Sequence, residues 1–259
     1  MVSTYVTYQR IAANLDQSLT LTASKKSVQL ESDYYLSKIG DVKSVEEFLG
    51  DTRLFKFAMT AFGLEDMAYA KGMIRKVLEE GVSDPTSFAN RLNDDRFLDL
   101  ATVFDFTTNG ENTTATTAAR QGVVDKYVRQ TMEVNAGEEN DGVRLALYFQ
   151  RAAPKVESAY GLLADDALWE VVKTVYGFPD EMANADIDKQ AAAVEKRLDI
   201  EDLKDPEKLA QLLVRFTNMW DVTQNVEPSP ILNLFTNSST PSIGLDLVMT
   251  LHNLKHGGG

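Results

Sequence analysis

The chain has 259 residues, of which 44% are hydrophobic and 25% are charged, and its formal net charge is −13. This composition is typical of a globular protein, long enough for one large domain or two smaller ones. The acidic balance disfavours binding to nucleic acid or to an anionic membrane surface, because both require clustered Lys and Arg. The chain has no cysteine, which excludes disulfides, thiolate metal sites and cysteine nucleophiles.

No apolar run approaches the roughly 18 residues that a membrane-spanning helix needs. The first residues also lack the compact apolar stretch of a cleaved secretory signal. We therefore expect neither a membrane span nor a cleaved signal peptide.

The two ends of the chain are less acidic than its middle. Residues 1–30 carry three basic side chains against one acid, and residues 229–259 carry one of each. Both ends have apolar residues at helical spacing: Tyr5, Ile11 and Leu15 in the first, and Leu245, Val248, Met249 and Leu254 in the second. These segments are candidate interaction surfaces, and two alternatives remain open. They dock on the acidic body, or they pair with each other or with a partner.

A repeated segment predicts how the middle of the chain is organised. Residues 54–64 return as residues 168–178, at an offset of 114 residues. In each copy a glycine, Gly63 or Gly177, follows an apolar helical pattern, where it favours the left-handed turn that ends a helix. Acidic residues come next, as suits the start of another helix. Each copy is therefore predicted to be a helix–glycine turn–helix unit.

The apolar spacing is helical almost throughout, so the predicted fold class is all-α. We expect a compact multi-helix domain built from two degenerate repeats, with the terminal helices packed alongside. The predicted segments are an N-terminal helical and polar segment, a first helical unit, a polar linker, a second helical unit, and a C-terminal helical segment with its tail: 1–30, 31–106, 107–114, 115–225 and 226–259.

Three residues are predicted to cap helices at their N-termini. Ser44 begins a capping box. Asp84 and Asp205 each precede a proline, which suits the first helical position because its missing N–H costs nothing there. A weaker similarity relates residues 51–54 to residues 94–97, and their shared Asp-x-Arg-apolar pattern also predicts a cap before an apolar helix.

The sequence has no constellation of catalytic or metal-binding residues. The two histidines, His252 and His256, would share a helix face but have no third ligand nearby. Acidic residues gather at 94–99 and 180–188, yet neither cluster has the frame of a calcium-binding loop. A phosphate-binding glycine loop and a nucleophile elbow are also missing. We therefore predict no catalytic residue, no cofactor, no metal and no small-molecule ligand.

Several stretches, taken together, carry a family resemblance. They are Tyr34-Tyr35, Val42-Lys43-Ser44-Val45-Glu46-Glu47-Phe48-Leu49, Ala61-Phe62-Gly63-Leu64-Glu65-Asp66, Lys76-Val77-Leu78-Glu79, Phe88-Ala89-Asn90-Arg91-Leu92 and Asp95-Arg96-Phe97. In this combination the chain resembles the alphaproteobacterial domain-of-unknown-function family 1217. Members of that family are often encoded among flagellar basal-body and motor genes, so the resemblance implies a flagellar structural or accessory role. It brings no catalytic or ligand-binding residue.

We therefore expect a non-enzymatic structural or protein-interaction component of the flagellum, with flagellar proteins or a second copy of itself as partners. Such a protein stays in the cytoplasm, or is exported with the flagellum without a cleaved signal peptide. The alternative is a cytosolic adaptor or export chaperone for flagellar proteins. A third hypothesis is a hydrolase that uses carboxylates of the acidic clusters. It requires a buried cleft in which at least two acids of shifted pKa converge.

Overall fold

The computed structural model describes residues 3–92 and 94–224. Within these ranges the chain is helical and contains no strand, so the predicted all-α class is confirmed. The described chain up to Asp221 belongs to one compact unit. None of the helices in these ranges is long and apolar enough to cross a membrane.

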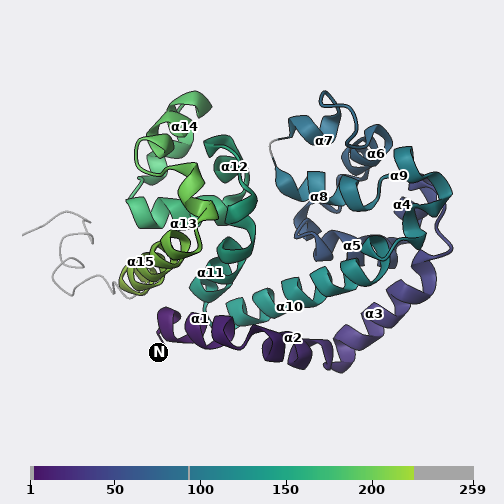
Figure 1. The fold of residues 1–259 in the computed structure, drawn as a ribbon, viewed down its shortest axis with the longest axis horizontal. Coiled ribbons are helices and arrows are strands. Elements are labelled where there is room, and N and C mark those ends of the chain that lie inside the picture. The colour runs from purple at the N-terminus through teal and green to yellow at the C-terminus, as the bar shows by residue number, and fades with distance from the viewer. Residues whose placement is uncertain (1–2, 93, 225–259) are drawn as a thin grey trace, which may run out of the picture. The chain divides into compact units, whose positions relative to one another are not determined.

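Two groups of helices, which we call the first and second modules, make up most of this unit (Figure 1). The first module contains α3 Lys26–Ile39, α4 Val45–Gly50, α5 Thr52–Ala61, α6 Lys71–Glu80, α7 Phe88–Arg91, α8 Asp95–Val103 and α9 Phe106–Asn109, with the short helices η1 Glu65–Met67 and η2 Gly110–Ala115. The second module contains α11 Asp141–Ala152, α12 Ala159–Ala164, α13 Asp166–Tyr176, α14 Ile187–Glu195 and α15 Pro206–Gln224, with the short helices η4 Ala153–Lys155, η5 Asp180–Asn184 and η6 Ile200–Lys204.

Three further helices join the modules: α1 Thr4–Ala13, α2 Leu15–Ala23 and α10 Val123–Glu139. Helix α10 follows a π-helical turn, η3 Ala118–Gly122. It packs against α5 of the first module and α11 of the second, and α2 lies beside it (Figure 1). Helix α10 is therefore the element that both modules share.

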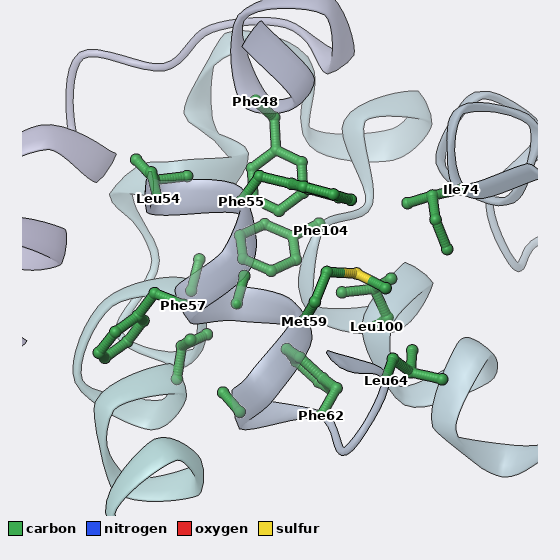
Figure 2. Close-up of a cluster of buried hydrophobic side chains, with 14 of the residues drawn as sticks. Phe48, Leu54, Phe55, Phe57, Met59, Phe62, Leu64, Ile74, Leu100 and Phe104 are labelled. Carbon is green, nitrogen blue, oxygen red and sulfur yellow. The ribbon is translucent and has the colours of Figure 1, made fainter. Parts of the chain in front are cut away.

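The buried apolar side chains fall into two clusters. The first lies within the first module and includes the ten side chains labelled in Figure 2: Phe48, Leu54, Phe55, Phe57, Met59, Phe62, Leu64, Ile74, Leu100 and Phe104. The second includes Val143, Leu147, Phe149, Val171, Val175, Leu213 and Phe216. The division falls on α10, which contributes Val128 to the first cluster and Met132 to the second.

The polar run 107–114 packs as part of the first module. It forms most of α9 and η2, and both Thr113 and Thr114 are fully buried. The Thr114 hydroxyl donates to the carbonyl of Val42 at 2.7 Å, and the Thr113 hydroxyl donates to the carbonyl of Asp105 at 3.1 Å. Because these hydroxyls satisfy backbone carbonyls of the first module, the run does not separate the cores. The cores divide further along the chain, on α10.

Gly63 and Gly177 follow helices α5 and α13 in equivalent turns. Both have positive φ angles, 71° and 64°. The amide after each glycine donates to the carbonyl five residues before it, at 2.8 Å after Gly63 and at 3.0 Å after Gly177. This back-bonding accompanies a left-handed residue at a helix end, which is the conformation that glycine adopts without strain.

The two copies of the repeat share a second local contact. Tyr34 donates to Asp51 at 2.8 Å, and Tyr148, which lies 114 residues later, donates to Asp165. Asp51 caps α5 by accepting two backbone amides, and Asp165 caps α13 in the same way. The copies therefore agree in contacts as well as in sequence, while their origin by duplication stays a prediction.

The three predicted caps do not all behave alike. Ser44 accepts a backbone amide at 3.2 Å at the start of α4, and Asp205 accepts two amides of the first turn of α15. Asp84 does not cap a helix, because α7 begins later, after Ser87. Asp84 instead accepts the amide of Thr86 at 2.7 Å. The Asp84 carboxylate also accepts the hydroxyl of Thr86 at 2.8 Å, and the two bonds together close a local turn in place of a helix start.

The N-terminal helix is used within the fold. Tyr8 is buried in the second core, and Ile11 and Leu15 pack against that core, so this apolar face does not point to solvent. Tyr5 is half-buried. The C-terminal candidates Leu245, Val248, Met249 and Leu254 lie outside the described residues.

A polar contact fixes the start of α1. Thr4 is fully buried, and its backbone amide and its hydroxyl both donate to Asp221 of α15. The same hydroxyl accepts from the side-chain amide of Asn140 at 2.8 Å. These bonds tie the beginning of the described chain to the loop before α11 and to the last described helix.

We expect Gly63→Ala and Gly177→Ala each to lower the free energy of unfolding by about 1 kcal/mol, because a Cβ disfavours positive φ. Sterics add little, since a Cβ at Gly63 would meet its nearest heavy atom at 3.7 Å and one at Gly177 would meet none within 4 Å. Gly72, exposed in α6 with open space around it, is the matched control. Gly72→Ala should raise stability by about 0.5 kcal/mol through helix propensity. Urea unfolding of the three variants would contradict this reading if the first two were as stable as the parent.

We expect Thr4→Val to lower the free energy of unfolding by about 1–3 kcal/mol, because it removes a buried hydroxyl and leaves the Asn140 amide without its acceptor. Thr7→Val on the same helix is the control and should change stability by less than about 0.5 kcal/mol. Urea unfolding measures the loss, and hydrogen exchange should show that the amides of α1 lose protection in the first variant. Equal protection of α1 in both variants would mean that the Thr4 contact does not hold this helix.

Candidate functional site at the junction of the two modules

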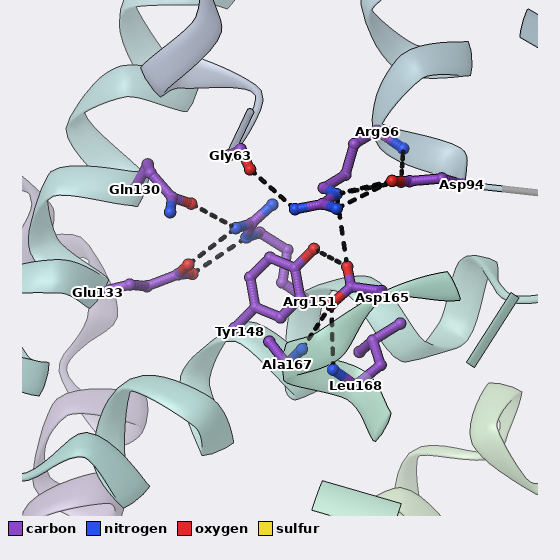
Figure 3. Close-up of polar contacts among 10 residues, drawn as sticks. All are labelled: Gly63, Asp94, Arg96, Gln130, Glu133, Tyr148, Arg151, Asp165, Ala167 and Leu168. Carbon is purple, nitrogen blue, oxygen red and sulfur yellow. Dashed lines mark hydrogen bonds and ion pairs between the residues drawn. The ribbon is translucent and has the colours of Figure 1, made fainter. Parts of the chain in front are cut away.

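The most enclosed group of charged side chains lies where the two modules face each other (Figure 3). Arg96 enters this junction from the first turn of α8, two residues after the capping residue Asp94. Its guanidinium donates to Asp94 at 3.0 and 2.9 Å and to the carbonyl of Gly63 at 2.9 Å. Arg96 is therefore held by the first module, and one edge of its guanidinium faces the second module.

Asp165 of the second module faces that edge of the Arg96 guanidinium. One of its carboxylate oxygens accepts the amides of Ala167 and Leu168 at 2.9 and 3.1 Å, which caps α13. The other oxygen accepts the hydroxyl of Tyr148 and lies 3.7 Å from Nε of Arg96. The side chain of Asp165 is 7% exposed, so the ion pair with Arg96 is largely shielded from water.

A second set of charges joins α10 to α11. Glu133 is 1% exposed, and its carboxylate binds Arg151 at 2.8 Å and Arg129 at 2.6 Å. Arg151 also donates to the side chain of Gln130 at 3.1 Å, and its guanidinium lies 5.0 Å from the ring centre of Tyr148. A carboxylate this deeply buried persists because two guanidinium groups neutralise and hydrogen-bond it.

Burial and charge shift the pKa values of the junction. Burial, followed by the charge of Asp165 and the hydrogen bond to it, raises the pKa of Tyr148 well above its ordinary value. Burial opposes the charge of Arg96 and of Arg151, but their carboxylate partners outweigh it and raise the pKa of both. At neutral pH the junction therefore holds a neutral phenol between fully charged guanidinium groups.

The junction encloses a cavity of about 40 Å³. It is lined by Asp94, Asp95, Arg96, Asp99, Lys126, Tyr148, Arg151, Lys155 and Asp165, together with a few apolar and small residues. Such a volume holds a water molecule, whereas sites for small molecules measure roughly 300–1,000 Å³. Two more open grooves of about 340 and 400 Å³ continue from it, one along Asn90 and Glu157 and the other along Asp66 and Glu170.

The acidic cluster at 94–99 divides into three roles. Asp94 caps α8 and binds Arg96. Asp99 pairs with Lys155 at 2.7 Å and with Lys126 at 3.6 Å. Burial, and then the charges of Asp99 and Asp94, raise the pKa of Asp95. Of the three, Asp95 is the carboxyl group without a hydrogen-bonded cation.

The acidic cluster at 180–188 is spread over the surface. Asp186 caps α14, Asp188 accepts the hydroxyl of Tyr160 at 2.7 Å, and Asp180 accepts from Lys173 at 3.1 Å. No group of three His, Asp or Glu side chains suited to a metal ion occurs in the part of the chain that the structure describes. His252 and His256 lie outside that part.

Sequence reasoning missed most of the junction. The Asp-x-Arg pattern pointed to Asp94 and Arg96, and Tyr148 follows Tyr34 at the 114-residue offset of the repeat, so three of its residues carried a signal in the sequence. The pairing of Arg96 with Asp165 joins residues far apart in the chain, and nothing in one sequence indicates it.

We expect Tyr148→Phe to lower the free energy of unfolding by about 1 kcal/mol at neutral pH, because Asp165 loses a buried hydrogen bond. The raised pKa of Tyr148 also makes its contribution pH-dependent. The unfolded phenol ionises near pH 10, so this contribution is full below about pH 10 and is lost as the pH rises further. By about pH 11 the parent should have lost about 1.4 kcal/mol more than Tyr148→Phe loses.

Tyr69→Phe is the matched control, because the Tyr69 side chain is 82% exposed. It should have the stability of the parent at neutral pH and the same decline in alkali. Urea unfolding between about pH 7 and about pH 11 compares the three proteins. Identical alkaline declines in all of them would show that the Tyr148 phenol does not contribute to the pH dependence.

Comparison with known proteins places the chain in a family. The model of the family "Protein of unknown function (DUF1217)" matches residues 61–209, which is more than half of the chain. A crystal structure of a protein from Agrobacterium tumefaciens, a structural-genomics target, is similar with 50% identity and a TM-score of 0.78, over 87% of this chain and 97% of that one. No curated protein matches. The chain therefore belongs to the DUF1217 family of proteins of unknown function.

Proposed function

We propose that the protein is a non-enzymatic structural or protein-interaction component associated with the bacterial flagellum. The observation that carries the non-enzymatic part is the use of the buried carboxylates at the junction. Asp94 and Asp165 hold helix amides, and Glu133 holds two guanidinium groups. A catalytic carboxyl group must exchange a proton or charge with its substrate, whereas these are committed to partners in their own fold.

The size of the enclosed space supports the same proposal. The cavity among these charges has a volume of about 40 Å³, which admits water but not an organic substrate. The grooves beside it are open to solvent and lined mainly by polar and charged side chains, whereas small-molecule sites are usually enclosed and predominantly apolar.

The flagellar association rests on the family. Its members are often encoded among flagellar basal-body and motor genes, and this chain belongs to it. The absence of cysteine, and the two ends that carry no net negative charge, are compatible with an exported flagellar component. On this proposal the protein remains in the cytoplasm or leaves it with the flagellum without a cleaved signal, and its partners are flagellar proteins or itself.

A cytosolic adaptor or export chaperone for flagellar proteins is the alternative. The two proposals differ in where the protein ends up. A structural component should appear in purified basal bodies or in the culture supernatant, whereas an adaptor should be found in the cytosol alone.

The place of Asp95 in the cavity and its raised pKa are the observations that favour a carboxylate-dependent hydrolase. Asp95 lines the cavity beside Asp99, and burial together with the charges of Asp99 and Asp94 raises its pKa. Asp99 is paired with two lysines, however, so the pair lacks a second carboxylate free to activate water. We place this candidate last.

The flagellar proposal is tested in a bacterium that encodes the protein. Deletion of the gene should impair swimming or reduce the number of intact basal bodies, and the parent gene should restore both. Normal swimming together with normal basal bodies in the deletion strain would rule the flagellar role out.

The same strain separates a structural role from a hydrolase. Asp95→Asn should restore swimming as well as the parent, because the proposal gives this acid no chemistry. The matched control is Glu138→Gln, which changes charge equally at an exposed position at the end of α10. If Asp95→Asn accumulates normally but fails to restore swimming while the control succeeds, the hydrolase becomes the better candidate.

A further inference from the structure

The two modules keep separate apolar cores. Every buried apolar residue of the described chain belongs to one of the two clusters. The partly buried Leu19 packs against both. The burial of apolar surface is what usually binds two halves of a domain into one cooperative body. Here that force acts mainly within each module and along α10.

In the described part of the chain, the side-chain hydrogen bonds and ion pairs that run directly between the modules join charged groups. Arg96 of α8 lies 3.7 Å from Asp165, the residue before α13. Lys155 of η4 donates to Asp99 of α8 at 2.7 Å. The Lys155 and Asp99 side chains are 50% and 40% exposed, so salt in solution reaches this pair. Ion pairs of this kind are weak and are screened as ionic strength rises.

Three of the four charged groups in these two ion pairs also have other partners, and the fourth, Lys155, is half-exposed to water. If the modules part, Arg96 keeps Asp94 and the carbonyl of Gly63. Asp165 keeps the Tyr148 hydroxyl and two backbone amides of α13. Asp99 keeps Lys126 of α10. Separation therefore leaves no buried polar group without a partner. Polar interfaces usually resist opening because separation would leave such groups unpaired.

We infer that the junction is a separable ionic strap: Arg96–Asp165 and Lys155–Asp99 hold the modules together, and their release lets the modules pivot about α10. The pivot lies between Val128 and Met132, where α10 passes from one core to the other. Opening widens the two grooves beside the cavity while each module stays folded. This inference does not depend on the flagellar proposal.

The test uses the full chain, which has no native cysteine to interfere with labelling. Thr102→Cys on α8 and Lys189→Cys on α14 place one spin label on each module at exposed positions. Pulsed electron paramagnetic resonance then measures the distance between the labels at low and high salt. The screening length falls from about 30 Å at 0.01 M to about 3 Å at 1 M, so salt weakens the exposed Lys155–Asp99 pair first and the shielded Arg96–Asp165 pair less.

A narrow distance distribution is expected at low salt, and it should broaden and shift to longer distances at high salt. Adding Arg96→Gln/Lys155→Gln should produce the broad distribution already at low salt. The matched control is Lys204→Gln/Lys208→Gln, which removes two positive charges from ion pairs with Glu201 and Asp202 inside the second module. It should keep the narrow distribution of the parent at low salt.

Hydrogen exchange distinguishes pivoting from unfolding. Amide protection in α5 and α13 should be unchanged under the conditions that lengthen the distance. The inference is overturned if the distribution is the same at both salt concentrations, or if its change coincides with lost protection in either helix. Lys155→Gln alone, at a half-exposed position, and the salt series of the labelled parent keep the test decisive if the double variant does not fold.

Discussion

Two apolar cores that share one helix are the constraint on which the rest of the structure depends. Val128 and Met132 lie about one turn apart on α10, yet they belong to different cores. Because each core closes on itself, the modules meet through polar side chains rather than through a third apolar surface. Charges buried at such a meeting point persist only when they are paired. The binding of Glu133 to both Arg129 and Arg151, which fastens α10 to α11, follows from this constraint.

The junction is built from aspartates that cap the N-termini of helices. A capping carboxylate uses one oxygen for backbone amides and has the other left over. At Asp94 the free oxygen binds the arginine two residues later, Arg96. At Asp165 the residue two positions later is Ala167, and the free oxygen binds Tyr148 and approaches Arg96 instead. At Asp51 the residue two positions later is also an arginine, Arg53, but it binds Glu31, and the free oxygen accepts the Tyr34 hydroxyl. The side chains packed around each cap therefore decide what its free oxygen binds, and at Asp165 that contact joins the modules.

The sequence was sufficient to predict most of the features that depend on neighbours within one or two helical turns. Helical periodicity and the glycine turns belong to this class. The same kind of reasoning went astray at Asp84, whose carboxylate also accepts the hydroxyl of Thr86, a bond that Asp205 lacks because Glu207 stands at the equivalent position. It also could not locate the division between the cores, because buried Thr113 and Thr114 resemble exposed loop residues until their carbonyl partners are known. The junction itself joins distant segments, and a single sequence contains no record of such pairs.

The fold also narrows where an interaction surface can lie. Ile11 and Leu15 pack against the second core, so the apolar face of the N-terminal helix is already used. Several apolar side chains of the described chain, such as Val6 and Leu21, are exposed, which is normal for a protein surface. The acidic body supplies charge, which governs encounter and selectivity more than affinity. Affinity for a protein partner depends on clustered apolar anchors, and the spacing within 245–254 provides such a cluster in the sequence. The interaction hypothesis therefore rests on the C-terminal segment more than on the N-terminal one.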